Sequence, residues 1–336
     1  MQPVKNNWFL LQKYHMKTAL IFGISGQDGA FLARFLLEKN YRIIGASRRD
    51  PANRFENLNQ LHIRDKIEMV SGSMESQDQI EALLQTHAPD EIYNLSGQSS
   101  VARSFELAGE TYASVCTATL NLLEAVRALH MPVKIFNAGS GDCFGYLEGR
   151  RAVEHSPLHP VSPYGAAKAA AFRHTDTHRQ AYGTFACTGI LFNHESRLRP
   201  DHFVTQKIVN TAISIADGTC NVLYLGNTGI IRDWGWAPEY VEAMWRMLQQ
   251  PEPVDYIIAT GTSISLEDFA DAVFTCLGLE WKKYVKTDPG FVRPADIPAM
   301  YADPSKAHRE LGWKARTMGR DVAGHMVEAR LSRKGV

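Results

Sequence analysis

Three glycines between a buried strand and an amphipathic helix constrain the fold of this chain more than any other feature. Segment 18–22 (TALIF) is apolar, Gly23, Gly26 and Gly29 follow it at G-x-x-G-x-x-G spacing, and 30–37 supplies an apolar helix face. Glycines at such a turn allow a tight bend, close approach of a pyrophosphate to the backbone, and close helix packing. The helix N-terminus then offers unpaired N–H groups to phosphates. The pattern predicts a dinucleotide site.

Short apolar segments continue to alternate with helical ones, which predicts a parallel sheet covered on both faces. Ser162 followed by Pro163 is typical of a helix N-cap and first turn, so Tyr164 is expected on the opening turn of a helix that ends near Gly183. We therefore predict an α/β fold with a doubly wound, Rossmann-like parallel sheet. The expected strands are 18–22, 41–46, 67–70, 91–95, 133–136 and 185–192, with a long helix over 109–130.

The regularity of this pattern changes after Asn193. We predict that 16–192 with parts of 229–260 form the nucleotide-binding domain, and that 193–228 with 261–330 form a smaller, discontinuous α/β substrate domain. Residues 1–15 are interpreted as an N-terminal extension. In the second half the expected elements are a helix over 203–217, short strands at 223–225 and 255–259, and a helix over 266–277.

The composition excludes several classes of protein. The 336 residues are 45% hydrophobic and 21% charged, as expected for a globular chain. Lys plus Arg equals Asp plus Glu at 36 each, so no global field favours nucleic acid or a membrane surface. No apolar run is long enough for a membrane helix, and the apolar patch 8–11 lacks a signal-peptide cleavage site. The five cysteines form no CxxC pair, which favours free thiols in the cytoplasm.

The residues after the second expected strand indicate which dinucleotide binds. An NAD site usually has an acidic residue at this point, which binds the ribose 2′-hydroxyl. Here the sequence is Ser47-Arg48-Arg49. Two guanidinium groups would bind a 2′-phosphate, so the pair favours NADP as the cofactor. The alternative interpretation is a charged turn that contacts only solvent.

Tyr164 and Lys168 lie four residues apart and are expected on one face of the helix. A nearby ammonium and a cationic nicotinamide ring would lower the pKa of the phenol, so that the tyrosine takes a proton from a substrate hydroxyl as hydride moves to the cofactor. Ser140, just past the fifth strand, is the candidate that orients this hydroxyl. Together with the glycines, the pair predicts redox chemistry on a hydroxyl-bearing carbon.

At this point the chain resembles a known family. The similarity extends from about residue 16 to residue 330, and is most specific in LFNHES and RDWG. The chain resembles the GDP-mannose 4,6-dehydratases, which belong to the extended short-chain dehydrogenases/reductases (SDRs). The matching segments are GISGQDGAFLARFLLEKNY, PDEIYNLSGQSSV, SPYGAAKAAA, GILFNHES, FVTQKI, RDWGWAPEYVEAMW, IATG, FVRPADI and DPSKAHRELGWK.

The resemblance implies an internal redox cycle on a nucleotide sugar. Hydride passes from C4 of the mannose ring to NADP⁺, a carboxylate removes the acidified C5 proton while the C6 hydroxyl leaves as water, and the hydride returns to C6. The product would be GDP-4-keto-6-deoxy-mannose. The exact hexose or heptose is left open.

The resemblance also implies roles for individual residues. The catalytic set would be Ser140, Asp142, Tyr164 and Lys168. Cofactor-binding positions would be Gly23, Gly26, Gln27, Asp28, Gly29, Arg48, Arg49, Ser73, Met74, Leu95, Gln98, Tyr164, Lys168, His194 and Arg199. Substrate-binding positions would be Ser99, Asn193, Lys207, Arg232, Arg293 and Asp296.

One stretch departs from the family pattern. Where relatives carry a Thr-Ser-Glu run within ASTSE, this chain has Ser140-Gly141-Asp142. Ser140 keeps a hydroxyl and Asp142 keeps a carboxylate, but the shorter arm draws that carboxylate back by about one methylene, and roughly 1 Å can change a rate on the order of 100-fold. Two alternatives therefore stay open: an epimerase or reductase of the same superfamily, and a non-catalytic NADP-binding scaffold.

The remaining expectations concern partners and metals. Segment 48–61 resembles a loop that reaches a neighbouring subunit's cofactor in the family, which implies a homo-oligomer, a tetramer by that likeness. His174 and His178 have metal-like spacing but no third ligand, so a solvated helix face and no metal site are expected. Trp234 and Trp236 are expected to pack at the domain junction rather than to stack on a base.

Overall fold

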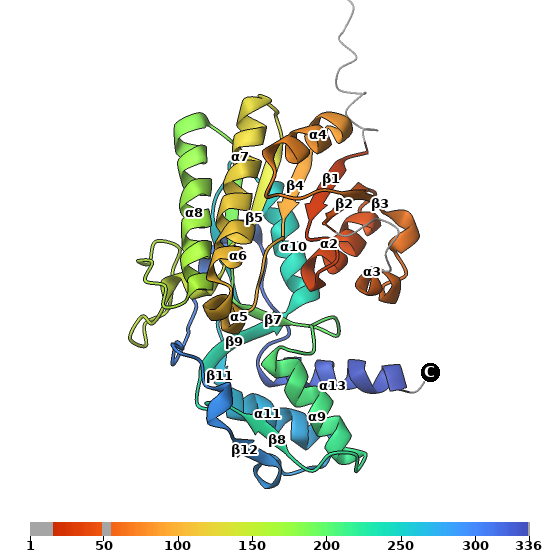
Figure 1. Ribbon diagram of the computed structural model, residues 1–336, viewed down its shortest axis with the longest axis vertical. Coiled ribbons are helices and arrows are strands. Elements are labelled where there is room, and N and C mark those ends of the chain that lie inside the picture. Colours follow the sequence, from red (N-terminus) through yellow and green to blue (C-terminus); the bar gives the residue numbers. More distant parts are fainter. Residues whose placement is uncertain (1–15, 49–54, 335–336) are drawn as a thin grey trace, which may run out of the picture.

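A computed structural model describes residues 16–48 and 55–334 (Figure 1). Its centre is a seven-stranded parallel sheet of order β10-β6-β5-β4-β1-β2-β3. This order runs outward from β1 in both directions, which confirms the predicted doubly wound fold and puts a crevice at the carboxyl end of the strands. The strands are β1 (Thr18–Phe22), β2 (Arg42–Ser47), β3 (Glu68–Ser71), β4 (Glu91–Asn94), β5 (Lys134–Ala138), β6 (Ala186–Leu191) and β10 (Tyr256–Ile258).

Alternate residues of β1 enter two separate cores, because successive side chains of a strand point to opposite faces. Ile21 packs with α2 (Gln27–Glu38) and with Tyr240 of α10 (Ala237–Leu248). Leu20 packs on the other face with Leu122 and the helices around it. The near-continuous apolar strand is thus explained by burial on both faces. Helices α4 (Gln77–His87) and α7 (Ala118–Ala128) lie on that second face, and the short α3 (Glu56–Gln60) packs against α2 on the first.

The helix that carries Tyr164 begins and ends where the sequence predicts. In α8 (Pro163–Tyr182) the Ser162 hydroxyl accepts a hydrogen bond from the Gly165 N–H, and Gly183 ends the helix in a left-handed conformation. The helix predicted over 109–130 is wrong in one respect. A π-helical turn, Ala113–Thr117, separates α6 (Ala108–Tyr112) from α7, and α5 (Val101–Glu106) precedes them. Hydrophobic periodicity does not distinguish such a turn from a regular helix.

A smaller group of elements lies below the carboxyl ends of the sheet in Figure 1. Helices α9 (Val204–Ala216), α11 (Leu266–Cys276) and α13 (Arg320–Lys334) share an apolar core with strand β8. Trp234 is buried there against Phe269, with ring centroids 5.2 Å apart, as expected of a packing residue. The predicted division into two domains stays a prediction. The other elements are β7 (Asn193–Glu195), β8 (Leu223–Leu225), β9 (Ile231–Trp236), β11 (Ser263–Ser265), β12 (Val285–Thr287) and α12 (Ser305–Leu311).

Strand β9 continues the chain from one group of elements to the other. It pairs with β7 in parallel and with β11 in antiparallel fashion, while β8 pairs with β12. The sequence predicts β8, through Leu223 and Leu225, but not β7, β9, β11 or β12. Strands β7, β11 and β12 have three residues each, too few for a measurable period of apolar residues, and the six residues of β9, IRDWGW, do not alternate between apolar and polar.

Candidate active site

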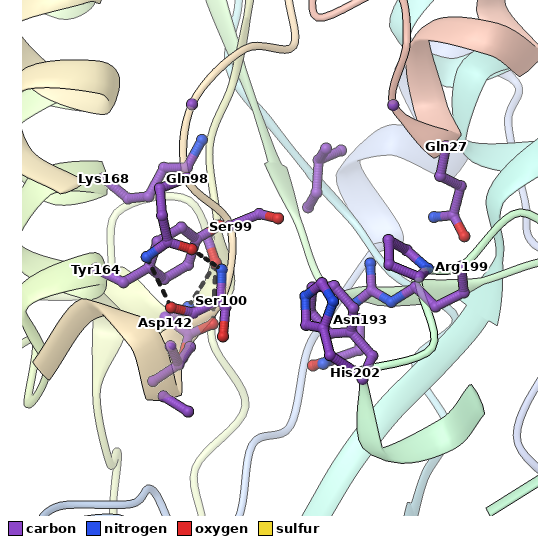
Figure 2. A pocket seen from close by; sticks show the side chains of 18 of the residues that line it. Gln27, Gln98, Ser99, Ser100, Asp142, Tyr164, Lys168, Asn193, Arg199 and His202 are labelled. Carbon is purple, nitrogen blue, oxygen red and sulfur yellow. Dashed lines mark hydrogen bonds between the residues drawn. The ribbon is translucent and has the colours of Figure 1, made fainter. Parts of the chain in front are cut away.

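One cavity of about 1060 Å³ extends between the sheet and the smaller group of elements. It lies at the carboxyl ends of β1, β4 and β5, where ligands bind in doubly wound folds, and its volume is at the upper end of the range for small-molecule sites. Figure 2 shows Tyr164, Lys168 and Asp142 on one side of the cavity and Asn193, Arg199 and His202 on the other. Except for Arg49, which is outside the described residues, every predicted site residue is part of its lining.

The glycine loop brings bare backbone to one end of this cavity. Gly23 has φ +82°, and a Cβ there would lie 2.5 Å from the Leu95 carbonyl oxygen. A Cβ on Gly29 would collide with the backbone of Gly23. Gly26 is the N-cap of α2 and makes no side-chain cap, so the first N–H groups of that helix are available to an anion. These observations fit a dinucleotide's pyrophosphate.

Next to this loop, Asp28 and His194 form a buried ion pair at 2.8 Å. Burial opposes the charge on both groups, yet their mutual attraction raises the pKa of His194 and lowers that of Asp28. The imidazole also stacks on Tyr240, and Gln27 donates to the His194 carbonyl. The side chains predicted to bind the cofactor are therefore held rigidly by one another, and their contact with it stays a prediction.

The far end of the cavity, beyond β2 and β3, carries Arg48. Its guanidinium lies 3.3 Å from Glu75, an acid that the sequence analysis did not single out. Ser73 accepts the Glu75 N–H with its hydroxyl, at 3.2 Å. The prediction of a basic group near a 2′-phosphate has a described candidate in Arg48 alone, because Arg49 lies outside the described residues.

The segment after β4 forms the wall between the two ends. Leu95 donates its N–H to Phe22, and the sulfur of Met74 accepts a hydrogen bond from Ser96. The Gln98 carboxamide donates to the Ser100 carbonyl at 2.9 Å and to Thr111 at 3.1 Å. Ser114 of the π-helical turn accepts the Gln98 N–H. The turn that the sequence did not reveal thus fixes a segment of the cavity wall.

The four predicted catalytic side chains meet at one place. The Ser140 hydroxyl donates to the Asp142 carboxylate at 3.0 Å. Lys168 donates to the Ala138 carbonyl at 2.7 Å, and its ammonium lies 5.8 Å from the centre of the Tyr164 ring. All four line the cavity beside the β5 end. The arrangement offers a hydroxyl, a phenol, an ammonium and a carboxylate to one ligand.

The charges of the chain do not lower the pKa of Tyr164 as the sequence analysis expected. Burial raises it above its ordinary value and the Asp142 carboxylate raises it further, whereas a hydrogen bond with Ser140 and the charge of Arg199 act the other way. Burial also lowers the pKa of Lys168 to about 8. The chain's own groups do not lower this pKa because Tyr164 and Lys168 are both taken out of water, and desolvation disfavours their charged forms. The contribution expected from a cationic nicotinamide ring stays a prediction.

Gly141 has an apolar wall behind it. A Cβ at this position would lie 3.0 Å from both Met300 and Phe192. A serine, which the family pattern has here, would require these two side chains to move. The loss of one polar group beside Asp142 is therefore coupled to the packing of the wall.

The opposite side of the cavity is basic. Arg232, which is 6% exposed, pairs with Asp296 at 2.8 Å, and Arg293 approaches the same carboxylate at 3.5 Å. Lys207 donates to the Tyr224 carbonyl at 2.7 Å. Cations that already lack much of their hydration bind a diphosphate at lower cost. Arg232, Arg293 and Asp296 thus form one cluster, and the other predicted substrate residues, Ser99, Asn193 and Lys207, line the same cavity.

Other side chains in this wall were not predicted. Phe291, which is 53% exposed, lies under the Lys207 ammonium, 3.4 Å from ring centre to nitrogen. Phe203 and Glu195 also lie here, around the predicted Arg199, whose guanidinium stacks on the Phe203 ring at 3.5 Å and pairs with the Glu195 carboxylate at 3.1 Å. Sequence signals existed for Phe291, which is the first residue of FVRPAD, and for His202, which directly precedes FVTQKI, whereas Glu75 has no motif around it.

The histidine pair on α8 departs from expectation. His178 is buried, not solvated, and its Nε2 lies 3.2 Å from Glu124 of α7. Tyr182 covers the ring edge-on. Within residues 16–48 and 55–334, no three His, Cys, Asp or Glu side chains gather as a metal site would require. In the same residues, no helix has both the length and the apolar character of a membrane span.

Comparisons with known proteins agree with this geometry. The family model for GDP-mannose 4,6 dehydratase matches residues 20–326. GDP-mannose 4,6 dehydratase 1 of Arabidopsis thaliana is 41% identical over 322 residues, covering 93% of this chain and 89% of the plant protein. The Vibrio cholerae GDP-mannose 4,6-dehydratase is 37% identical over 349 residues, covering 94% of both chains. A dTDP-glucose 4,6-dehydratase from Bacillus anthracis, solved with NAD, has the same fold, with a TM-score of 0.82, 18% identity, and coverage of 95% of this chain and 98% of that one.

Proposed function

The chain belongs to the GDP-mannose 4,6-dehydratase family, and from that premise we propose that it dehydrates GDP-mannose, or a related GDP-manno-sugar, to GDP-4-keto-6-deoxy-mannose with NADP. The observation that carries the proposal is the meeting of Ser140, Asp142, Tyr164 and Lys168 in a cavity that also contains a bare glycine loop and a buried arginine cluster. Family membership supplies the reaction, and these side chains supply groups suited to it.

The residues around the glycine loop would hold NADP. The uncapped start of α2 and the Gly26 backbone suit the pyrophosphate, and Arg48 suits a 2′-phosphate. The chemistry that NADP supplies when bound is reversible acceptance of a hydride.

In the proposed first step, Tyr164 accepts the proton of the C4 hydroxyl while Ser140 orients that hydroxyl. Burial raises the pKa of the phenol, so the tyrosine needs a nearby positive charge to act as a base. The Lys168 ammonium lies on the same helical face, four residues on. Its pKa of about 8 keeps it largely protonated at neutral pH.

In the second step, Asp142 takes the proton from C5, which the C4 ketone has acidified, and gives it to the C6 hydroxyl, which leaves as water. C5 then takes up a proton that has exchanged with solvent as the hydride returns to C6. A carboxylate is suited to this transfer because it accepts and then returns one proton at the same place. Ser140 donates to Asp142 at 3.0 Å, which holds the carboxylate beside the phenol.

The nucleotide part of the substrate is proposed to lie against the basic wall. Arg232 and Arg293 would bind the diphosphate, and Asp296 a ribose hydroxyl, with Asn193 and Lys207 beside them. Arg232 is buried and shares the Asp296 carboxylate with Arg293, so its guanidinium can form strong charge-assisted hydrogen bonds to a phosphate.

A second function keeps the fold and the sugar nucleotide but omits the elimination, as in an epimerase or reductase. The shorter arm of Asp142 and the apolar wall behind Gly141 favour this alternative. The loss of one methylene moves a carboxylate by roughly 1 Å, enough to slow a proton transfer on the order of 100-fold.

One assay separates the candidates. The protein is incubated with GDP-mannose in deuterated water, and the sugar nucleotides are analysed by mass spectrometry and NMR. The dehydratase gives a 4-keto-6-deoxy sugar, lighter by one water and carrying deuterium at C5. An epimerase or reductase gives a product that retains the C6 oxygen, and a scaffold gives no product with any nucleotide sugar.

The Tyr164→Phe variant tests the proposed proton acceptor. It is expected to abolish product formation, since a phenyl ring cannot take the proton of the C4 hydroxyl. Its fold should be intact because only the oxygen is removed, which circular dichroism and cofactor retention would check. Undiminished oxidation at C4 would show that another group is the acceptor.

We also propose a cytoplasmic homo-oligomer, with a tetramer as the expected state. The support is the cysteine pattern, five thiols without a CxxC pair, and the resemblance of segment 48–61 to an intersubunit loop. Light scattering behind size exclusion at low protein concentration measures the assembly directly, and a monomer there would contradict it.

A further inference from the structure

The end of the cavity beyond β2 and β3, where the proposed NADP would place its adenosine, contains an acid that the sequence did not predict. Strands β2 and β3 end together, and the Gly72 N–H donates to the Ser47 carbonyl at 3.0 Å. Arg48 follows one strand and Glu75 follows the other by a short turn, which Ser73 stabilises by accepting the Glu75 N–H. The two side chains then meet at 3.3 Å, and both line the cavity.

This pairing bears directly on the cofactor. A basic residue after the second strand is the group that accommodates a 2′-phosphate, whereas NAD sites have an acid that binds the ribose 2′-hydroxyl. Here the base follows β2 and the acid follows β3, so both signals are present at the same end of the cavity. The Glu75 carboxylate already pairs with the Arg48 guanidinium, which a 2′-phosphate would need as its own partner.

Two contributions oppose the 2′-phosphate. It must displace the Glu75 carboxylate from Arg48, or share the guanidinium with it at close range. A phosphate and a carboxylate within a few ångströms repel each other, and the side chains are 64% and 44% exposed, so solvent weakens the repulsion without cancelling it. NAD, whose 2′-hydroxyl is uncharged, meets neither opposition.

We propose that Glu75 sets the cofactor preference of this enzyme: it competes with the 2′-phosphate for Arg48 and so reduces the selectivity for NADP over NAD. The inference rests on the proposed function, because it concerns the cofactor of that reaction. It goes further in assigning to one acid of this chain a role that the arginines alone do not predict.

The experiment measures binding, not turnover. Nucleotide-depleted protein is titrated separately with NADP and NAD by calorimetry, for the wild type, Glu75→Gln, Arg48→Gln and the double variant. Glu68→Gln is the matched control: Glu68 pairs with Arg42 on the same two strands, is exposed to a similar degree, and does not line the cavity.

Glu75→Gln is expected to tighten NADP binding on the order of 5-fold and leave NAD binding unchanged, as suits a partly exposed ion pair. Glu68→Gln should leave both unchanged. Arg48→Gln should weaken NADP, and in its background the gain from Glu75→Gln should vanish, because the competition acts through the guanidinium.

Three outcomes contradict the proposal. NADP binding that is unchanged or weaker in Glu75→Gln would show that Glu75 does not compete with the 2′-phosphate. A gain in NADP affinity from Glu75→Gln that persists in the Arg48→Gln background would show that Glu75 repels the phosphate directly and does not act through Arg48. Weaker NAD binding with unchanged NADP binding makes Glu75 a ligand of the ribose hydroxyl. None of these depends on dehydration of GDP-mannose, so the proposed reaction can fail while the inference stands; wild-type protein that binds neither dinucleotide overturns both.

Discussion

The Ser140 hydroxyl has one proton and two neighbours that can accept it. It donates to Asp142 at 3.0 Å, and its hydrogen bond with Tyr164 lowers the pKa of the phenol. A hydroxyl has a single donor, so it can support either the carboxylate or a phenolate at a given moment. When Tyr164 is protonated the serine is free to hold Asp142, and when Tyr164 has lost its proton the serine can turn to it. The serine thus couples the two groups that the proposed reaction uses in sequence.

Replacing Asp142 by Asn separates the two steps. The amide keeps the volume and can still accept from Ser140, but it cannot remove the C5 proton. Product formation is expected to fall by about 10²- to 10⁴-fold, the usual contribution of a general base. Addition of GDP-mannose should still produce the fluorescence of reduced cofactor, because C4 oxidation needs only Tyr164. Deuterium exchange at C5 that continues in the variant would mean that another group is the base.

The rate should also fall in alkaline solution. Burial lowers the pKa of Lys168 to about 8, against an opposing effect of the Asp28 carboxylate. The group carries its charge below that value and loses it as the pH rises, so the positive charge beside Tyr164 disappears on the alkaline side. A plot of kcat against pH should therefore decline with a midpoint near pH 8. A rate that stays constant well above this pH would show that the ammonium is not needed.

At the scale of elements, Asp233 ties strand β9 to the end of the central sheet. Its carboxylate is fully buried and accepts the Thr260 N–H at 2.9 Å and the Gly261 N–H at 2.7 Å. The neighbouring Arg232 therefore enters the cavity from a strand whose position is fixed on the side of β10. The basic wall depends on this connection between segments far apart in the chain.

Asp233→Asn tests the connection. An amide has one accepting oxygen, and its NH₂ group would face a backbone donor, so the free energy of unfolding is expected to fall by about 1–3 kcal/mol. Burial raises the pKa of Asp233 from 3.8 to about 6, so the folded chain binds a proton more tightly than the unfolded one. The wild type should thus lose stability as the pH rises between these values, and the variant should lack this slope. Urea unfolding across that range measures both effects, and equal slopes in the two proteins would contradict the assignment.

The elements that the sequence predicts are those with long apolar periods or strong end signals. The glycine loop, α8 with its Ser162 cap, and the strands of the central sheet belong to this group. Two features were not predictable for physical reasons. The π-helical turn keeps the apolar face of a regular helix, and the pairing of Asp28 with His194 joins residues 166 positions apart. Contacts of this second kind exist only once the chain has folded.

At the scale of the whole molecule, the cavity separates two apolar cores. One core lies against α2 and α10 and the other between α9, α11 and α13. The predicted catalytic groups Tyr164 and Lys168 come from α8, and Figure 2 shows them across the cavity from Asn193, whereas Lys207 comes from α9 of the second core. A ligand that contacts both sides would stabilise the folded chain by mass action, and would do so more than a ligand of either side alone.

Binding of GDP, a ligand of the basic wall, should raise the melting temperature, and Arg293→Gln should remove about half of that rise. At a 100-fold excess over Kd the ligand adds about 2.7 kcal/mol, which raises Tm by roughly 5 °C for a chain of this size. Arg293 is half-buried and approaches Asp296 at only 3.5 Å, so its loss should leave the unliganded Tm almost unchanged while weakening GDP on the order of 10-fold. Arg320→Gln, which breaks an exposed pair with Asp271 on the same side of the molecule, is the control and should keep the full shift. Thermal scanning with and without GDP measures all three proteins; an equal shift in Arg293→Gln would place the diphosphate elsewhere in the cavity.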